Sequence, residues 1–225
     1  MHDAVALDAH TGQVGVGLRL QQAHDMGAVA AVHQDGDGAA QRVGDLAEYT
    51  IKGLRLGGFT GEIYISPRNA EMSAHLAETQ NCQVLSSNQA VANSSECLVI
   101  STRPAHCLEA LAELLFQPKQ LLVSVVAGMP VADIRNVVPA DVEIVRAMPV
   151  NSAQAVASPT LIYPDHQQVS ALFDYCGDSI AVDDEAAFDQ GSVLACVYTW
   201  YFGLFEQLIQ STTNEALPAD KAKAL

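Results

Sequence analysis

The sequence is short of positive charge. It has 11 Lys and Arg against 26 Asp and Glu, which gives a formal net charge of −15 at pH 7. Such a surface repels phosphate backbones and anionic lipid, so we expect neither nucleic acid nor a membrane as a partner. The apolar uncharged run of residues 190–205 is shorter than the roughly 18 residues of a membrane span. With no apolar run of signal-peptide length at the N-terminus, we expect a cytoplasmic protein.

Several signatures of metal sites and of hydrolases are also missing. The five cysteines show no CxxC spacing, the seven histidines form no HxxxH or HExxH pair, and there is no GxSxG sequence. An odd number of cysteines in apolar settings predicts buried free thiols. We therefore expect no metal ion and no Ser-His-Asp hydrolase.

Residues 1–42 lack ten amino-acid types: Ile, Phe, Tyr, Trp, Lys, Glu, Ser, Pro, Asn and Cys. Every type occurs from Val43 onward. This break fits a disordered extension or a stretch read in a shifted frame, and we favour the second because a motif then starts halfway, at Val43. The segment HQDGDGAAQR before it is long and polar for a strand-to-helix turn. We predict that residues 1–42 lie mostly outside the compact domain and that residues 27–32 are a poor substitute for a first strand.

After residue 43, apolar strands alternate with helical segments. Asp45 can cap a first helix, which Gly57 and Gly58 end. Strands rich in Val, Ile and Leu separated by helices indicate a parallel sheet covered on both faces. We predict an α/β fold, a Rossmann-type doubly wound parallel sheet over residues 43–183. A long apolar helix that starts near Asp189 would open a helical domain over residues 184–225. The predicted strands are 62–66, 82–86, 97–101, 121–127, 142–148, 160–163 and 179–182, and the predicted helices are 69–80, one near 89, 104–115, one from 130, and 166–175.

Ligands of parallel α/β sheets bind beyond the carboxyl ends of the strands. The residues at these positions are therefore the candidate site. They are Ser66, Arg68 and Asn69; Thr102 and Arg103; Ala127 and Gly128; and Met148, Pro149 and Asn151. The small residues Ala127 and Gly128 would let a ligand approach the backbone. Met148 and Pro149 can equally form an ordinary strand-ending turn.

The residues after the second strand favour a phosphorylated dinucleotide. An acidic residue there binds the ribose hydroxyls of NAD, whereas an Arg accommodates the 2'-phosphate of NADP. Here the strand ends at Ser66 and continues to Arg68 and Asn69, with no acid before Glu71. Arg68 can form a charge-assisted pair with phosphate, and Asn69 can cap the next helix. The sequence predicts NADP, unless Arg68 is a solvated surface charge.

The segments ISPRN, VISTRP, SVVAGMPV and VRAMPVNSA occur in the order and spacing of the pyrroline-5-carboxylate reductases, which the chain resembles over residues 43–218. The resemblance implies an NADP-dependent oxidoreductase that reduces a cyclic imine in proline biosynthesis. It also implies a homodimer or higher homo-oligomer, built through a helical dimerisation domain. It assigns cofactor contacts to Gly44, Asp45, Leu46, Ser66, Arg68, Asn69, Thr102, Arg103, Pro104, Ala127 and Gly128, and substrate contacts to Met148, Pro149 and Asn151.

The chain also departs from this family pattern. Arg42 stands at an earlier glycine of the cofactor loop, Arg103 replaces a lysine, and Val150 takes the place of an asparagine that comes one residue later. Residues 195–200, ACVYTW, stand where the family has SGSGPA. No side chain stands out as a general acid, so no catalytic residue is assigned. A non-catalytic or incomplete nucleotide-binding relative therefore stays open as the alternative.

Overall fold

The computed structural model describes residues 16–19, 45–67, 69–213 and 221. The strands are β1 (Val16–Arg19), β2 (Glu62–Ile65), β3 (Gln83–Val84), β4 (Cys97–Ile100), β5 (Leu121–Ser124), β6 (Glu143–Met148), β7 (Thr160–Tyr163) and β8 (Ser179–Ala181). The helices are α1 (Asp45–Leu56), α2 (Ala70–Gln80), α3 (Asn88–Asn93), α4 (Pro104–Ala112), α5 (Val131–Arg135), α6 (Gln167–Phe173), α7 (Glu185–Thr212) and the 3-10 helix η1 (Asn151–Ala155).

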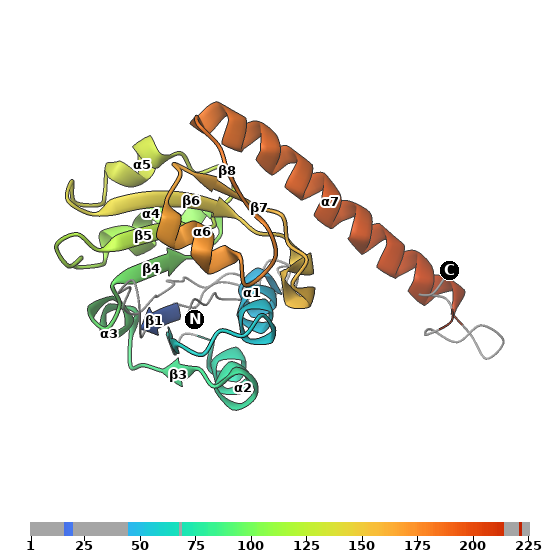
Figure 1. The fold of residues 1–225 in the computed structure, drawn as a ribbon. Helices are drawn as coiled ribbons and strands as arrows, with labels where there is room; N and C mark the ends of the chain where they lie inside the picture. Colours follow the sequence, from blue (N-terminus) through green and yellow to red (C-terminus); the bar gives the residue numbers. More distant parts are fainter. Residues whose placement is uncertain (1–15, 20–44, 68, 214–220, 222–225) are drawn as a thin grey trace.

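The strands form one eight-stranded sheet in the order β3-β2-β1-β4-β5-β6-β7-β8. β2 runs parallel to β3, and β4, β5 and β6 run parallel to one another. β7 is antiparallel to β6 and parallel to β8, so this last pair runs the opposite way. Helices α1, α2 and α6 pack on one face, and α3, α4 and α5 on the other (Figure 1). The prediction of a doubly wound α/β sheet is confirmed, although the β7–β8 pair is not parallel to its neighbours.

β1 lies between β2 and β4, near the middle of the sheet, and is antiparallel to both. We expected residues 1–42 to lie mostly outside the compact domain, and for residues 16–19 this was wrong. Two strands separated by the width of one strand expose unpaired backbone N–H and C=O groups, which an extended segment of either direction can satisfy. The candidate strand at residues 27–32 lies outside the described residues, as does the turn that leads to Val43.

Two glycines of α1 and its C-terminal turn allow close packing against later segments of the chain, η1 and the residues after α6. A Cβ at Gly53 would lie 2.7 Å from the carbonyl carbon of Ala153 in η1 and closer still to its oxygen. A Cβ at Gly57 would lie 2.9 Å from the carbonyl carbon of Tyr175, just after α6. The buried thiol of Cys176 also donates to the backbone oxygen of Thr50 in α1. These contacts hold α1 against the segments that follow β6 and α6.

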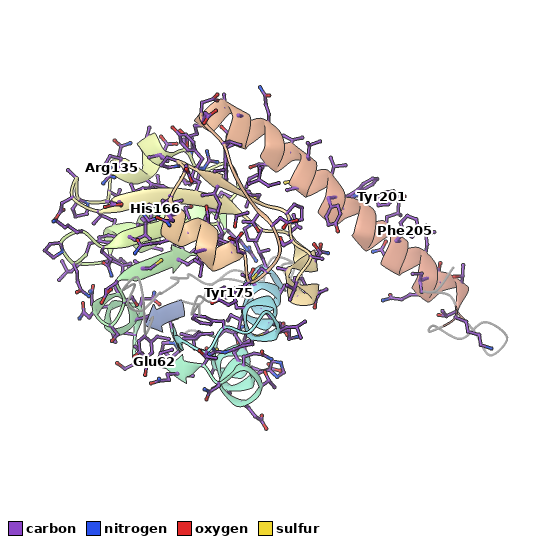
Figure 2. All side chains as sticks on the ribbon, in the orientation of Figure 1. Glu62, Arg135, His166, Tyr175, Tyr201 and Phe205 are labelled. Carbon is purple, nitrogen blue, oxygen red and sulfur yellow. The ribbon has the colours of Figure 1, made fainter. Side chains whose placement is uncertain are left out.

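Helix α7 packs on the sheet only at its beginning. Its first turns contact β6 and β7, whereas Leu194 is 72% exposed and Trp200 is 69% exposed. Tyr201 and Phe205 stand on the part of α7 that runs away from the sheet, with ring centroids 4.8 Å apart (Figure 2). By length and composition α7 could cross a membrane, a test that core helices of soluble proteins also pass. The helix is longer than the uncharged run that we counted, because it includes Glu185, Asp189 and Glu206.

Candidate functional site at the carboxyl edge of the sheet

The ends of β2, β4, β5 and β6 bring most of the predicted site residues to one edge of the sheet. These four strands run in the same direction, so their carboxyl ends face the same side. Helix α1 runs back to the start of β2 through a five-residue connection, residues 57–61. Its amino end therefore faces the carboxyl edge. This arrangement places a helix N-terminus, with its unpaired N–H groups, beside the ends of the strands.

Ser66, at the end of β2, is fully buried. Its backbone oxygen accepts a hydrogen bond from the Ser73 hydroxyl at 2.8 Å, which ties β2 to α2. Its own hydroxyl has no hydrogen-bond partner in the described part of the chain. A buried hydroxyl without a partner is costly, so this position suits a hydrogen bond to a bound ligand.

Asn69 caps α2, as the sequence predicted. Its Oδ1 accepts a hydrogen bond from the Met72 N–H at 3.0 Å. The cap fixes the start of α2 next to Ser66. Arg68, the residue on which the NADP prediction rests most heavily, lies outside the described residues.

Thr102 and Arg103 follow β4 at the middle of the edge. The Thr102 side chain lies next to the Cys107 thiol. Burial raises the pKa of this thiol to about 12, and the interaction with Thr102 makes the rise smaller. Arg103 precedes Pro104, the first residue of α4, and makes no side-chain cap hydrogen bond. Its Nη2 atom is buried and has no partner among the described residues. The Arg103 guanidinium is therefore a cationic hydrogen-bond donor at the carboxyl edge of the sheet, and its Nη2 has no acidic partner among the described residues.

Ala127 and Gly128 follow β5, and both are exposed. Gly128 has a φ of +66°, and a Cβ built there would meet nothing within 4 Å. The backbone conformation explains the glycine. The open space beside it agrees with the expectation that a ligand could approach here.

Met148 and Pro149 are buried at the end of β6, and Asn151 begins η1 and is half-buried. The N–H of the intervening Val150 donates to the Ser158 hydroxyl at 2.9 Å. The turn is therefore held from below by Ser158, which the sequence analysis missed. The signal that could have identified it is a serine just before a predicted strand, as Ser158 stands two residues before Thr160.

The glycine loop cannot be placed, because Gly44 and the side chain of Asp45 lie outside the described residues. Leu46 lies in the first turn of α1 and is half-buried, and its carbonyl accepts a hydrogen bond from Thr50 at 2.8 Å.

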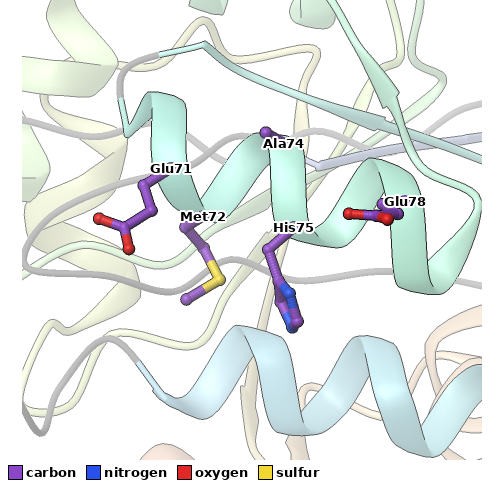
Figure 3. Close-up of a pocket in the computed structure, with 5 residues that line it drawn as sticks. All are labelled: Glu71, Met72, Ala74, His75 and Glu78. Atoms are coloured by element: carbon purple, nitrogen blue, oxygen red, sulfur yellow. The ribbon is translucent and has the colours of Figure 1, made fainter.

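A hollow of about 410 Å³ lies along α2 and faces α1 (Figure 3). It is lined by Glu71, Met72, Ala74, His75 and Glu78, none of which was predicted as a site residue. His75 lies 3.7 Å from Glu48 of α1. Carboxylates on both sides disfavour a phosphate-bearing ligand in this hollow. Among the described residues, no group of three or more His, Cys, Asp and Glu side chains could hold a metal ion.

Comparisons with known proteins agree with this geometry. The family model described as NADP oxidoreductase, coenzyme F420-dependent, matches residues 43–128. The pyrroline-5-carboxylate reductase of Pseudomonas aeruginosa is 30% identical over 176 residues, which cover 73% of this chain and 64% of that protein. The one of Mycobacterium tuberculosis is 27% identical over 198 residues, 81% of this chain and 67% of that protein. The chain thus spans about two thirds of the length of these relatives.

Solved structures show the same fold. A 1-pyrroline-5-carboxylate reductase from Streptococcus pyogenes superimposes with a TM-score of 0.65 at 24% identity, over 80% of this chain and 70% of that one. The Plasmodium falciparum pyrroline carboxylate reductase with NADP bound gives a TM-score of 0.65 at 16% identity, over 81% and 71%. The resemblance predicted from the motifs is confirmed. The family match begins at Val43, where the composition changes.

Proposed function

We propose that this chain is an NADP-dependent reductase of the pyrroline-5-carboxylate reductase type, acting on the C=N bond of a cyclic imine in proline biosynthesis. One observation carries the proposal: at the carboxyl edge, Ser66 Oγ and Arg103 Nη2 are buried donors without partners in the described part of the chain. A dinucleotide in a doubly wound sheet lies at this edge, with its phosphates near helix N-termini. The match to an NADP oxidoreductase family supports the same cofactor, and the similarity to pyrroline-5-carboxylate reductases supports the same substrate class.

The roles of the edge residues follow from their chemistry. Ser66 would donate to the phosphate on the adenosine ribose, together with Arg68. Arg103 would hold the pyrophosphate side by charge, in place of the lysine common in the family. The exposed backbone of Ala127 and Gly128 leaves room for the cofactor beside β5.

NADPH, when bound, supplies the hydride, so the contribution of the chain is to orient the reactants. Met148 and Pro149 are buried at the end of β6 and would form the apolar wall against which the imine lies. A wall of this kind excludes water from the reacting carbon. Asn151, at the start of η1, follows this wall by two residues and would contact the imine ring.

A homodimer is part of the proposal. Eight large apolar side chains on α7 are 40% or more exposed: Val193, Leu194, Val197, Trp200, Tyr201, Leu204, Phe205 and Leu208. A helix with so much exposed apolar surface is stable in water only when another surface covers it. Pairing of α7 with a second copy would bury it. The absence of nucleic-acid and membrane partners and the cytoplasmic location stay predictions.

Nucleotide titration of purified protein tests the cofactor site. We expect Arg103→Met to weaken NADPH binding about tenfold, as expected for loss of one hydrogen bond to a charged group. Lys119→Met is the matched control, because Lys119 is an exposed cation in the turn that precedes β5, at the opposite edge. Equal affinities of the two variants would contradict the placement of the cofactor. NADPH binding without turnover of a cyclic imine would favour the non-catalytic alternative.

A further inference from the structure

Arg146 is a charged residue inside the sheet. It lies on β6, opposite Ser124 of β5 and Tyr163 of β7, and is 1% exposed. Arginine is almost never this buried unless it is paired. The only other fully buried side chains of comparable size in the described part of the chain are apolar. The position therefore calls for an explanation other than packing.

Among the described residues, the side chains that pair with Arg146 come from the first two turns of α7. Nη1 donates to Glu185 Oε1 at 2.7 Å and to Asp189 Oδ1 at 2.9 Å. The guanidinium carbon lies 4.4 Å from the ring centre of Phe188. The spacing of these three residues, i, i+3 and i+4, puts them on one face of the helix. Arg146 thus fixes both the position and the rotation of α7 at its start.

Two further contacts strengthen this attachment. Glu185 Oε1 also accepts the N–H of Val131, the first residue of α5, at 2.8 Å. Gly191 lies so close to β7 that a Cβ would sit 3.5 Å from Leu161 Cγ and closer still to Cδ1. Beyond Ser192, α7 is largely exposed, with Val193 already at 62%. We call residues 193–212 the free part of α7. The first two turns of α7 therefore set the direction of this free part.

A small tilt at the start of α7 displaces the residues at its far end by a larger distance. Tyr201 is 12 residues beyond Asp189, which is about 18 Å at 1.5 Å per residue. A tilt of about 10° at the attachment would move Tyr201 by about 3 Å over this length. The site end of β6 is also near, since Met148 is two residues beyond Arg146.

We propose that Arg146 is a positioning residue, which through Glu185 and Asp189 sets the pose of α7 relative to the carboxyl edge where the imine is reduced. The inference rests on the proposed reductase function for its kinetic consequence. Its structural consequence is independent of that function. Nε and Nη2 of Arg146 have no partners among the described residues, so Nη1 carries both ion pairs.

Asp189→Asn is the informative variant, because the Asp189 side chain is 52% exposed and its loss should not prevent folding. The control is Glu143→Gln, which changes another polar contact of β6, that of Glu143 Oε2 with His166 Nε2 at 3.2 Å. Glu143 does not contact α7 in the described contacts. Each variant thus removes one negative charge next to a residue of β6 or on it, but only Asp189 lies on α7.

The pose of α7 can be measured by the distance between two spin labels. Cys196 lies on α7 and is exposed, whereas the other four cysteines are buried and will not be labelled. The second label goes on Glu109→Cys, an exposed position of α4. Labelled protein is diluted into unlabelled protein to suppress distances between copies. We expect Asp189→Asn to broaden or shift the distance distribution and Glu143→Gln to leave it unchanged. An unchanged distribution in Asp189→Asn overturns the proposal.

Kinetics give the second readout. We expect Asp189→Asn to lower kcat/KM for the imine about tenfold while the Kd for NADPH changes less than twofold. A merely stabilising role would lower the melting temperature and the active fraction at unchanged KM, and that pattern also overturns the proposal. If the wild type binds NADPH but reduces no cyclic imine, the proposed function fails. The distance distributions alone then show whether Arg146 positions α7.

Discussion

Replacing Gly53 by Ala tests how α1 is held in place. A methyl group there would lie 2.7 Å from the Ala153 carbonyl carbon and 3.2 Å from Cys176 Sγ. Carbon atoms pack best at about 3.5 to 4.0 Å, so α1 and η1 must separate by about 1 Å. The obstacle is backbone, which cannot rotate away as a side chain can.

The energetic effect has two opposing parts. Overpacking of a closed contact costs about 1 to 3 kcal/mol, and the rigid backbone here favours the upper end. Exchanging Gly for Ala in a helix gains about 0.5 to 1 kcal/mol. We therefore expect Gly53→Ala to lower the free energy of unfolding by about 2 kcal/mol. NADPH binding should also weaken, because the amino end of α1 moves with the helix.

Urea unfolding with linear extrapolation measures the first effect. Gly203→Ala is the matched control, since Gly203 also lies within a helix and a Cβ there would meet nothing within 4 Å. That variant should be as stable as the wild type or up to about 1 kcal/mol more stable. If Gly53→Ala proves as stable as Gly203→Ala, the close contact between α1 and η1 is wrong.

Four other outcomes are expected. Ser66→Ala should leave the free protein at least as stable as the wild type, because it removes a buried hydroxyl without a described partner. The same variant should weaken the binding of NADPH about five- to tenfold. A loss of stability with unchanged NADPH affinity would refute the role of Ser66 in binding. In native protein only Cys196 should react with a thiol reagent, because burial raises the pKa of Cys82 and Cys107 to about 12 and also raises that of Cys97 and Cys176. These four thiols have higher pKa values in the folded than in the unfolded chain, so stability should be complete below about pH 8.5 and decline as the pH rises above it; a flat stability curve up to pH 10 would contradict their burial. Trp200→Glu should convert a dimer to a monomer in analytical ultracentrifugation, and a wild type that is already monomeric at high concentration would exclude pairing through α7.

The sequence predicted the elements after residue 43 well, because each has a strong local signal. Apolar runs such as CLVI mark buried strands, and Asn69 and the glycines after Leu56 mark helix ends. The edge residues could be predicted for the same reason, since each lies at the end of a strand or within a few residues after it. What local pattern cannot give is pairing between distant segments.

Three findings depend on such pairing. The antiparallel entry of residues 16–19 between β2 and β4 has no signal in the four residues VGLR. The reversal of β7 relative to β6 follows from η1 and the short turn after it, which redirect the chain. Arg146 did carry a signal, since a lone charge in the strand EIVRAM demands a partner. Its acidic partners lie 39 and 43 residues further on, beyond the reach of local pattern.

We expect the cofactor preference to depend on Arg68 and Ser66 together. Arg68→Ala should weaken NADPH by about 1.5 to 3 kcal/mol and leave NADH almost unchanged, because only NADPH carries the 2'-phosphate. Parallel titrations with the two nucleotides give the answer. Equal weakening of both would show that Arg68 does not contact the 2'-phosphate.

The most direct test of the proposed function is the oxidation of NADPH by the wild-type chain with and without a five-membered cyclic imine that carries a carboxylate. We expect oxidation to require the imine, to proceed faster with NADPH than with NADH, and to yield the saturated cyclic amino acid in equal amount. A folded protein that binds NADPH but shows no imine-dependent oxidation would contradict the assignment as a reductase.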